Sequence, residues 1–409
     1  MIYDSWFSTV AKIRGERAVC KTYVFGFRIF MLILDILGEV KFSYSGQFCQ
    51  LAAENWNKER MVTGIRLAGH QLAEPQFDSP ADLVGWMGAV QAQDYAMAKW
   101  AVGVRLKGAM LSRINEALAS GEIVRTHVMR PTWHFVAGKD LRWMQKLTGP
   151  RVKKAIDSWV KSGGLEVSEK QYTVCNDLLG KILSGGRCLT REEIEMEMEQ
   201  AGVPIADERV RRYILRAEVE GIVCSGADKD GKPTYALLDE QVAPVSELVK
   251  EEALARLADA YFRSHSPATL NDFVWWSGLT VREAREAVGL ISEQLVTERF
   301  ETGEFLVHVS CRQAGNDAVV HLLPAYDEYL ISYKERTTVM AAEHCPKAFN
   351  NWGIFYPVVL SQGRIVGNWK KTVRKSEVAL SVSVFDSSGV IPEDALQNAE
   401  KRYRNFLKS

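Results

Sequence analysis

The sequence predicts an α+β protein made of three tandem winged-helix units followed by a small β-barrel-like C-terminal domain. A pattern of helices followed by a strand hairpin recurs along the chain, and repetition of this kind identifies an architecture directly. The chain also has 409 residues, of which 47% are hydrophobic and 25% charged, which is enough for several globular domains. We divide it into an N-terminal extension, three units and the C-terminal domain, at residues 1–60, 61–165, 166–245, 246–317 and 318–409.

The first sixty residues differ from the rest in composition and pattern. They mix isolated aromatic residues, two cysteines and one apolar patch, without helix caps or a clear period. We expect a poorly packed extension, or an artefact of an upstream start with Met61 as the true first residue. A docking helix over residues 24–38 is the alternative.

The first unit shows two helices and a hairpin. Ser79 is placed to cap a helix that has Pro80 at its first position, where proline is favoured. Ser112 is expected to cap a second helix. The segments EIVRTHVMR and TWHFV are typical of two strands of a hairpin.

The second and third units repeat a sequence of three helices and a hairpin more clearly. In the second, Thr190 and Glu193 have the spacing of a capping box, and an Asp-Gly turn separates two short strands. In the third, Thr269 begins a helix that Gly278 ends, and Thr280 begins the next. The strands LVTERF and EFLVHV then form its hairpin.

The C-terminal residues change to strand-like alternation. The stretches AVVHLLPAYDEYLISY, YPVVLSQGRIVGNWKK and VALSVSVF alternate in polarity, with QGR as a hairpin turn. A final helix is expected over 393–407. Asp327 and Glu328 are expected to be structural, holding this domain against a winged-helix unit.

Charge, cysteine and hydropathy patterns limit the classes of function. Lys plus Arg and Asp plus Glu both total 51, so no net charge attracts the protein to nucleic acid or membrane. The seven cysteines are widely spaced without a CxxC pair, and the histidines form no HExxH motif. We expect a reduced, cytoplasmic protein, nucleoid-associated if bacterial, without a metal, a cofactor or a membrane span.

The local charge nevertheless suggests a nucleic-acid partner. The stretch from Arg105 to Asp157 contains eleven basic and four acidic residues. Winged-helix units commonly bind duplex DNA, whose phosphates attract such a basic stretch. A solvated helix face is the alternative explanation for several of these basic residues. The candidate DNA-binding residues are Arg125, Arg130, Lys139, Arg211, Arg212, Lys370 and Lys371.

Five motifs occur in an order that resembles a known family. They are LVGWMGAVQAQDYAMAKWAVGVRL, RTHVMRPTWHFV, SPATLNDFVWWSGLT, LLPAYDEYLISYKER and GRIVGNWKK. This set resembles the winged-helix DNA-binding family that contains the AlkZ and YcaQ DNA glycosylases, over about residues 61–380. The resemblance implies three tandem winged helices, a C-terminal β-barrel and a cleft for duplex DNA. It also implies monofunctional excision of alkylated purines, with Gln91-Ala92-Gln93 matching the Gln-apolar-Gln signature of the AlkZ branch.

The two glutamines fit a narrow kind of chemistry. Alkylation at N7 makes a purine cationic, so that it can depart as a neutral base without being protonated. Two amides can then hold the attacking water and orient the sugar, although neither can act as a general base. Gln91 and Gln93 would point the same way only in an extended segment. The alternative is that they solvate the end of a helix.

Two further residues are candidates for supporting roles. Asp94 could orient Gln91 or bind a water, and His134, next to Trp133 on a predicted strand, is more typical of a hydrogen-bonded core histidine than of a catalytic one. We therefore expect a glycosylase for cationic N7- or N3-alkylpurines, acting as a monomer on double-stranded DNA; whether crosslinked purines are also substrates is left open by the sequence. A non-catalytic winged-helix regulator is the alternative, and it would prefer a DNA sequence rather than a lesion.

Overall fold

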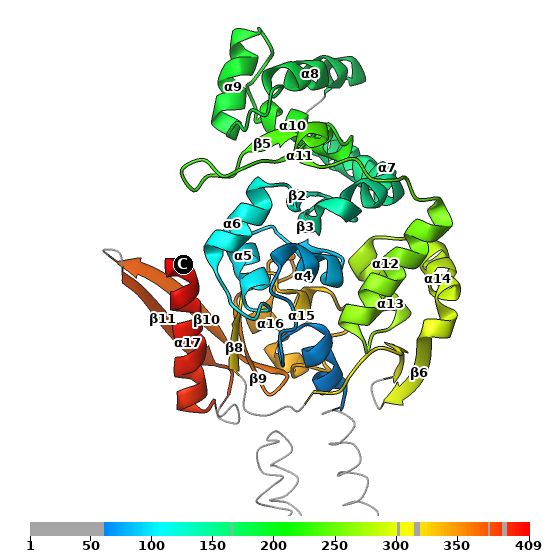
Figure 1. Ribbon diagram of the computed structural model, residues 1–409, viewed down its shortest axis with the longest axis vertical. Coiled ribbons are helices and arrows are strands. Elements are labelled where there is room, and N and C mark those ends of the chain that lie inside the picture. Colours follow the sequence, from blue (N-terminus) through cyan, green and yellow to red (C-terminus); the bar gives the residue numbers. More distant parts are fainter. Residues whose placement is uncertain (1–60, 165–166, 301–302, 315–319, 375–376, 387–390) are drawn as a thin grey trace, which may run out of the picture.

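The computed structural model describes residues 61–164, 167–300, 303–314, 320–374, 377–386 and 391–409. The expectations for residues 1–60 lie outside this part of the chain. The described chain has a mixed α and β fold (Figure 1), in which α8 (Glu169–Ile182) and α9 (Arg191–Gln200) lie at one end of the long axis. No helix among the described residues is long and apolar enough to cross a membrane.

The first region is centred on a small sheet. Residues 61–69 are helical, and Ser79 caps the helix α4 as expected, because its hydroxyl accepts the N–H of Asp82 at 3.2 Å. The predicted hairpin is present, and an additional strand, β1, pairs with it in the order β1-β3-β2. The elements are α4 (Pro80–Met87), β1 (Val90–Gln91), α5 (Tyr95–Gly103), α6 (Leu111–Ala119), β2 (Ile123–His127), β3 (Trp133–Ala137) and α7 (Gly138–Ser162).

The expected cap of α6 is wrong. The helix begins at Leu111, so Ser112 lies inside its first turn and its hydroxyl does not cap it. The last residue of the chain takes this role instead: the Ser409 hydroxyl accepts the N–H of Leu111 at 2.9 Å, and its carbonyl accepts the N–H of Ser112 at 3.3 Å. A partner 298 residues away satisfies the free N–H groups of the helix end.

The second region contains the expected three helices and hairpin. Thr190 and Glu193 form the predicted capping box at the start of α9. The elements are α8 (Glu169–Ile182), α9 (Arg191–Gln200), α10 (Arg209–Val219), β4 (Val223–Ser225), β5 (Tyr235–Leu237) and the short α11 (Leu238–Gln241).

The third region also matches its predicted element order. Thr269 caps α13, which ends at Gly278 with φ +67°, and Thr280 caps α14. The elements are α12 (Lys250–His265), α13 (Leu270–Ser277), α14 (Val281–Leu290), the 3₁₀ turn η1 (Ser292–Gln294), β6 (Leu295–Phe300) and β7 (Gly303–His308).

The C-terminal region contains an open sheet rather than a barrel. Its four described strands pair antiparallel in the order β11-β10-β9-β8, and four strands are too few to close on themselves. Part of the expected strand AVVHLLPAYDEYLISY is instead the helix α15. The elements are β8 (Val320–Leu323), α15 (Glu328–Ile331), η2 (Ala342–His344), α16 (Cys345–Ala348), β9 (Val358–Ser361), β10 (Arg364–Arg374), β11 (Glu377–Val384) and α17 (Glu393–Lys408).

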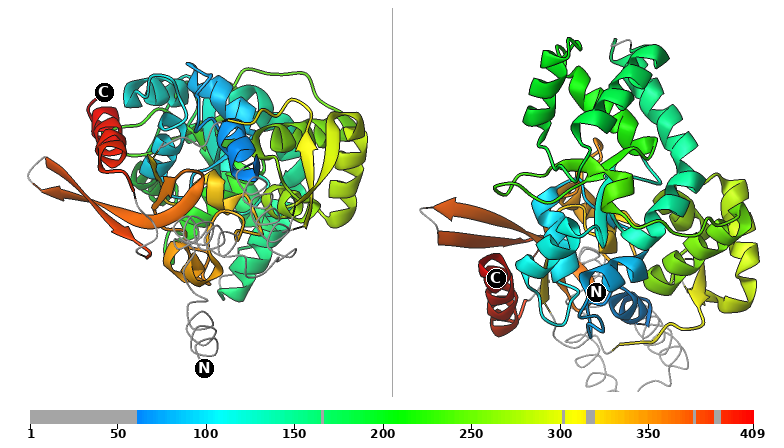
Figure 2. Two further views of the ribbon diagram at one scale, coloured as in Figure 1. Left: turned by 90° about the horizontal axis from the view of Figure 1, so that it is seen from below. Right: turned by 45° about the horizontal axis from the view of Figure 1, so that its top comes forward.

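Two strands of this sheet, β10 and β11, are longer than the other two. Figure 2 shows the orange strands β10 and β11 extending away from the body of the molecule, while the red helix α17 lies beside the sheet. The QGR hairpin turn is present between β9 and β10, with both Gln362 and Gly363 at positive φ. This conformation matches the right-handed twist of the two strands.

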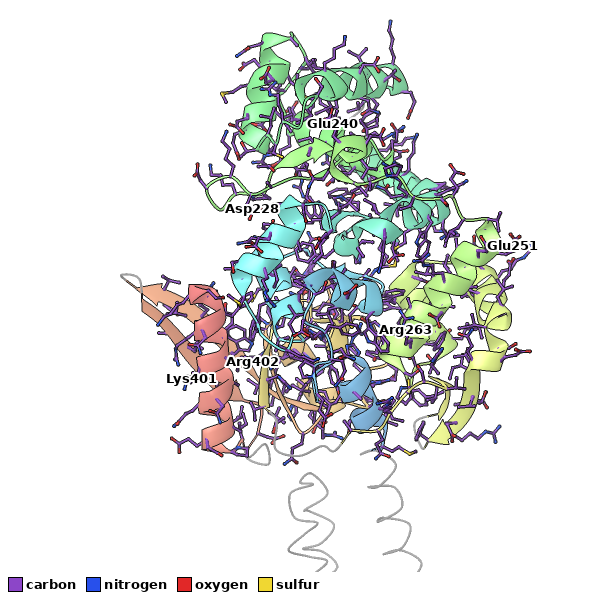
Figure 3. All side chains as sticks on the ribbon, in the orientation of Figure 1. Asp228, Glu240, Glu251, Arg263, Lys401 and Arg402 are labelled. Atoms are coloured by element: carbon purple, nitrogen blue, oxygen red, sulfur yellow. The ribbon has the colours of Figure 1, made fainter. Side chains whose placement is uncertain are left out.

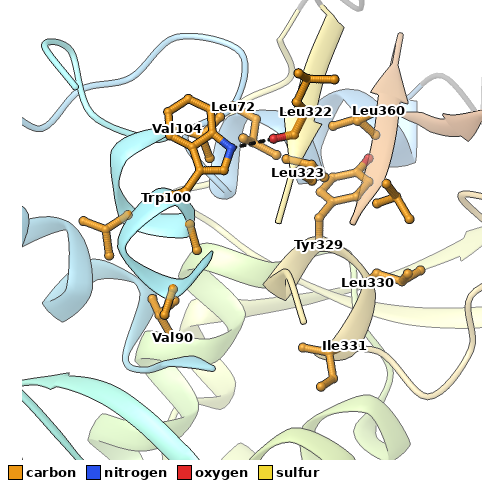
Figure 4. Packing of buried hydrophobic residues seen from close by; sticks show 14 of the residues in the cluster. Leu72, Val90, Trp100, Val104, Leu322, Leu323, Tyr329, Leu330, Ile331 and Leu360 are labelled. Atoms are coloured by element: carbon orange, nitrogen blue, oxygen red, sulfur yellow. Dashed lines mark hydrogen bonds between the residues drawn. The ribbon is translucent and has the colours of Figure 1, made fainter. Parts of the chain in front are cut away.

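Three apolar clusters join the first region to its neighbours. One contains residues of α4, β1 and α5 together with residues of β8, α15 and β9, including Val90, Trp100 and Tyr329 (Figure 4). The indole of Trp100 donates to the carbonyl of Leu322 at 2.6 Å. A second core joins the first region to α12–α14 and includes Cys224 and Leu238 of the second region, and a small cluster packs α7 against α10. The rest of α8–α10 has a core of its own.

Candidate active site

The Gln-Ala-Gln segment begins in a strand and ends in a bend at Gln93. Gln91 is the second residue of β1 and lies opposite His134 in the antiparallel pairing with β3. The N–H of Ala92 donates to the carbonyl of Trp133 at 2.8 Å, so the pairing continues one residue past the strand. The chain then leaves the sheet at Gln93, before α5 begins.

The two glutamines differ in exposure. Gln91 is buried, with 4% of its surface exposed, and its Oε1 accepts the N–H of Ala92 at 3.1 Å. Gln93 is exposed. The segment therefore runs from the interior to the surface.

A buried carboxylate binds the main chain of Gln91. Its N–H donates to Oε1 of Glu328 on α15 at 2.5 Å, across 237 residues of sequence. Glu328 is 1% exposed. Burial would raise the pKa of this carboxyl, but His265, Ser332 and the Gln91 N–H outweigh it and lower the pKa to about 2. The group is therefore charged at neutral pH.

Arg125 binds the same segment from the other side. Its Nε donates to the carbonyl of Ala92, between the two glutamines, at 3.0 Å. Its guanidinium carbon lies 4.3 Å from the ring centroid of Trp133 and 5.1 Å from that of Tyr95. These contacts bury Arg125, and burial lowers its pKa. Its guanidinium therefore fixes the motif rather than projecting into solvent.

The β4–β5 hairpin of the second region covers this arginine. The hydroxyl of Ser225 accepts the main-chain N–H of Arg125 at 2.8 Å. Asp228, labelled in Figure 3, accepts the hydroxyl of Tyr95 at 2.5 Å and pairs with Lys99 at 2.6 Å. The hairpin and the motif are therefore joined by polar contacts.

Asp94 and His134 both have structural partners. Asp94 caps α5, because its Oδ1 accepts the N–H of Met97 at 3.0 Å. His134 is fully buried, and Nδ1 donates to the carbonyl of Thr132 at 2.9 Å, which leaves Nε2 as an acceptor. Burial and the nearby Arg130 lower the pKa of His134 to about 3, so the ring is neutral at neutral pH.

The basic excess of residues 105–157 is largely neutralised by folding. Seven of its eleven basic side chains form ion pairs with acidic residues outside the stretch: Arg105, Lys107, Lys139, Arg142, Lys146, Arg151 and Lys153. A count along the sequence could not detect these partners, because they come from distant segments. The local excess is therefore not a single basic surface.

The candidate DNA-binding residues fall into different environments. Lys139 lies 3.9 Å from Asp82, and Arg211 lies 3.4 Å from Glu208, both at the surface. Arg212 lies over the ring of Trp159. On β10, Lys370 is exposed and Lys371 is half-buried.

Arg130 has an unusual position at the tip of the β2–β3 hairpin. Its guanidinium carbon lies 5.8 Å from the ring centroid of Trp275, and both Nε and Nη2 are buried without a hydrogen-bond partner among the described residues. Burial lowers its pKa, and Glu328 opposes this shift. Buried N–H groups of a cation normally require an acceptor, so this site is suited to an anion.

Sequence reasoning did not find the contacts that hold the motif. Glu328 was expected only to join domains, and Arg125 to bind DNA, yet both bind the main chain of residues 91–92. The only sequence signal for either contact is the presence of these residues in the ordered motifs. Among the described residues, no group of His, Cys, Asp and Glu side chains could hold a metal ion.

Comparison with known proteins identifies the family of the chain. A family model described as "DNA glycosylase AlkZ-like" matches residues 84–406. A curated protein of Streptomyces sahachiroi, named "Interstrand DNA cross-link repair glycosylase", is 27% identical over 348 residues, which are 80% of this chain and 91% of the relative. The solved structure of Streptomyces sahachiroi DNA glycosylase AlkZ has the same fold, with a TM-score of 0.69 and 23% identity over 85% of this chain and 96% of that one. Because the family model spans most of its length, the chain belongs to the AlkZ-like family of DNA glycosylases.

Proposed function

We propose that this DNA glycosylase excises cationic N7- or N3-alkylated purines, crosslinked ones included, from duplex DNA by attack of water at C1′. The observation that carries the proposal is the Gln91-Ala92-Gln93 segment at the end of β1, whose main chain is bound at Gln91 and at Ala92 while its two glutamines offer only amides. In this proposal Gln91 and Gln93 hold the water and the sugar.

The surrounding groups support a base that leaves without being protonated. The pKa of His134 is lowered to about 3 by burial, and Glu328 is charged, with a pKa of about 2. Asp94 uses its carboxylate to cap α5. An acid able to protonate a departing purine at neutral pH is therefore not among these neighbours of the motif. A base that already carries a positive charge does not need one.

The supporting residues have distinct roles in this proposal. Arg125 and Asp94 fix the two ends of the segment, through the Ala92 carbonyl and the first turn of α5. His134, opposite Gln91 on β3, presents the unpaired acceptor Nε2 in the buried space beside it. That acceptor suits a water molecule or an N–H group of the substrate.

We also propose how the protein binds duplex DNA. The regions 61–165, 166–245 and 246–317 act as winged-helix units, supported by their helices followed by hairpins, and residues 318–409 form a fourth domain. Arg130, at the tip of the β2–β3 hairpin, is the candidate phosphate contact near the motif; its Nε and Nη2 lack an acceptor and would have to become accessible when DNA binds. Lys139, Arg211, Arg212, Lys370 and Lys371 are the more peripheral candidates. The protein acts on DNA as a monomer.

The test is base release from defined lesions. Purified protein is incubated with duplex DNA containing 7-methylguanine, 3-methyladenine or uracil, and the freed base is measured by mass spectrometry. We expect release of both methylated purines above the spontaneous rate and none of uracil. A Gln91→Ala, Gln93→Ala double variant with normal folding should lose the release. Full activity of that variant, or no release by the native protein, would overturn the proposal.

A second substrate tests whether the protein also acts on crosslinked purines. The relative named for interstrand crosslink repair shares 27% identity, so its substrate is carried over here only as a proposal. Duplex DNA with two guanines crosslinked through N7 should yield separated strands on a denaturing gel after incubation. Release of 7-methylguanine with no unhooking would restrict the substrates to simple alkylpurines.

A further inference from the structure

Glu328 occupies the junction between the motif, the third region and the C-terminal region. The preceding residue fixes its place: Asp327 caps α15 by accepting the N–H of Tyr329 at 2.9 Å and forms a two-pronged ion pair with Arg105, at 2.7 and 2.9 Å. Both partners of that pair are 1% exposed at the side chain. The start of α15, and with it Glu328, is therefore tied directly to the end of α5.

The two oxygens of Glu328 have different partners. Oε1 accepts the N–H of Gln91 at 2.5 Å. Oε2 accepts the indole N–H of Trp276 at 3.2 Å and the hydroxyl of Ser332, and it lies 3.7 Å from Nε2 of His265. One oxygen thus binds the motif, while the other is held by α12, α13 and α15.

This carboxylate has no direct Lys or Arg partner. Among the described residues, no Lys or Arg lies within 4 Å of it; the buried Arg130 interacts with its charge from farther away, and the ring of His265, whose pKa burial lowers, lies 3.7 Å from Oε2. Burying a charge without a direct Lys or Arg partner is costly, and stability alone is served as well by a neutral hydrogen-bond acceptor of the same shape. A role in the reaction would account for keeping the charge.

We propose that Glu328 is a positioning residue for glycosidic bond hydrolysis: it fixes the main chain of Gln91, and its buried negative charge favours the positive charge that develops on the sugar. This inference rests on the proposed function. The side-chain amides of Gln91 and Gln93 are neutral. The negative potential that would stabilise a positively charged sugar must therefore come from a charged group next to the motif, and Glu328 is such a group. A fixed charge in a dry interior acts without reorganisation during the reaction.

The first experiment measures the contact without using activity. Deuterium exchange of the peptide containing Gln91 is followed by mass spectrometry in the native protein and in Glu328→Gln. The native amide should be protected, and the substitution should speed its exchange about 10-fold or more, because a neutral acceptor binds an N–H more weakly than a charged one. Equal exchange in both proteins would overturn the positioning role.

The second experiment separates positioning from general destabilisation. In release of 7-methylguanine, Glu328→Gln should lower kcat about 10-fold or more and leave KM within about 2-fold, at a temperature where circular dichroism shows it folded. Asp272→Asn is the matched control, because Asp272 is equally buried and accepts the N–H groups of Lys334 and Glu335 but has no hydrogen bond to residues 90–94. Its kcat should be unchanged. Equal losses in both variants would reduce Glu328 to a structural residue.

A milder variant covers the case in which Glu328→Gln does not fold. Ser332→Ala removes one donor from Oε2 and leaves the Gln91 contact intact, so it should lower kcat less than Glu328→Gln would and leave KM unchanged. An unchanged kcat would overturn the proposal. If the native protein releases no base at all, the proposed function fails, while the exchange experiment still decides whether Glu328 holds Gln91.

Discussion

The motif strand β1 is held from two sides that use different chemistry. On the C-terminal side, the contacts are the Glu328 carboxylate on Gln91 and the adjacent pair of Arg105 with Asp327, all nearly inaccessible to solvent. On the side of the second region, the β4–β5 hairpin contributes Asp228, whose pair with Lys99 has side-chain exposures of 18% and 9%. The first side is dry, and the second is partly open to water.

The apolar cores show the same difference. Val90 of β1 shares a core with α15 and the C-terminal sheet, whereas most of α8–α10 has a core of its own. The second region shares apolar contacts with the first elsewhere, through Cys224 of β4 beside Val124 and between α10 and α7. It meets the motif itself through the hydrogen bonds and the ion pair of the β4–β5 hairpin, so we infer that the C-terminal side sets the position of the motif and that the hairpin covers it.

The largest expected effect of a single substitution lies on the dry side. Asp327→Ala leaves the Arg105 guanidinium buried with one main-chain partner, the carbonyl of Ala101. Loss of one partner of a buried pair should lower the free energy of unfolding by about 3–5 kcal/mol, as measured by urea denaturation. A loss below about 1 kcal/mol would show that this side is not the dominant anchor.

The matched control removes both charges. Arg105→Met with Asp327→Leu replaces the pair by apolar side chains and leaves no buried charge behind. It should recover much of the stability lost in Asp327→Ala. A double variant as unstable as the single one would assign the loss to packing rather than to the orphaned charge.

The sequence predicted the contacts that are local in the chain. The caps at Thr190, Thr269 and Thr280 and the paired strands depend on residues a few positions apart, where spacing alone decides the geometry. For Gln91 and Gln93 the sequence yields only a condition: their side chains point the same way if the segment is extended, because side-chain direction depends on the backbone conformation.

The contacts that hold the site join distant segments, which no local pattern specifies. Glu328 binds Gln91 across 237 residues, and Ser409 replaces Ser112 as the cap of α6 across 298. Seven basic residues of the 105–157 stretch find acids elsewhere in the chain, which a linear charge count cannot detect. The order of helices and strands could be predicted from the sequence, whereas the residues that pack against each other across the chain could not.

A second prediction compares two buried histidines through pH. Burial lowers the pKa of His134 and of His321 on β8 from 6.5 to about 3. Below pH 6.5 the unfolded chain binds a proton that the folded one does not, so stability falls as the pH falls from 6.5 towards 3. Each histidine should cost about 2 kcal/mol between pH 6.5 and pH 5.

Removing either histidine should flatten this dependence. His134→Gln and His321→Gln are each unfolded by urea at a series of pH values, and each should reduce the slope by about 1.4 kcal/mol per pH unit. A slope that changes only for His321→Gln would mean that the space beside His134 admits water and lets that ring titrate normally.

A third prediction tests the open side. Asp228→Asn removes the charge that pairs with Lys99 and accepts the Tyr95 hydroxyl. Because this pair is partly exposed, the loss of unfolding free energy should be about 1 kcal/mol, well below that of Asp327→Ala. Its kcat for 7-methylguanine release should stay within about 2-fold. A loss of activity as large as that of Glu328→Gln would show that both sides position the motif equally.

The smallest expected effects are those of two surface cations, one on each side of the motif. Lys370 on β10 is exposed and has no ion pair among the described residues, whereas Arg211 on α10 pairs with Glu208. Replacing either with Gln should change the unfolding free energy by less than about 0.5 kcal/mol.

The effects of the two substitutions on DNA binding should differ, because the Glu208 carboxylate already weakens the positive potential of Arg211. When the DNA association constant K is measured from 50 to 300 mM salt, the slope of log K against log salt concentration should fall in magnitude by about 0.9 in Lys370→Gln and by less than half of that in Arg211→Gln. The reverse order would place the DNA backbone over the second region, and the more open side of the motif would then be the one that holds the substrate.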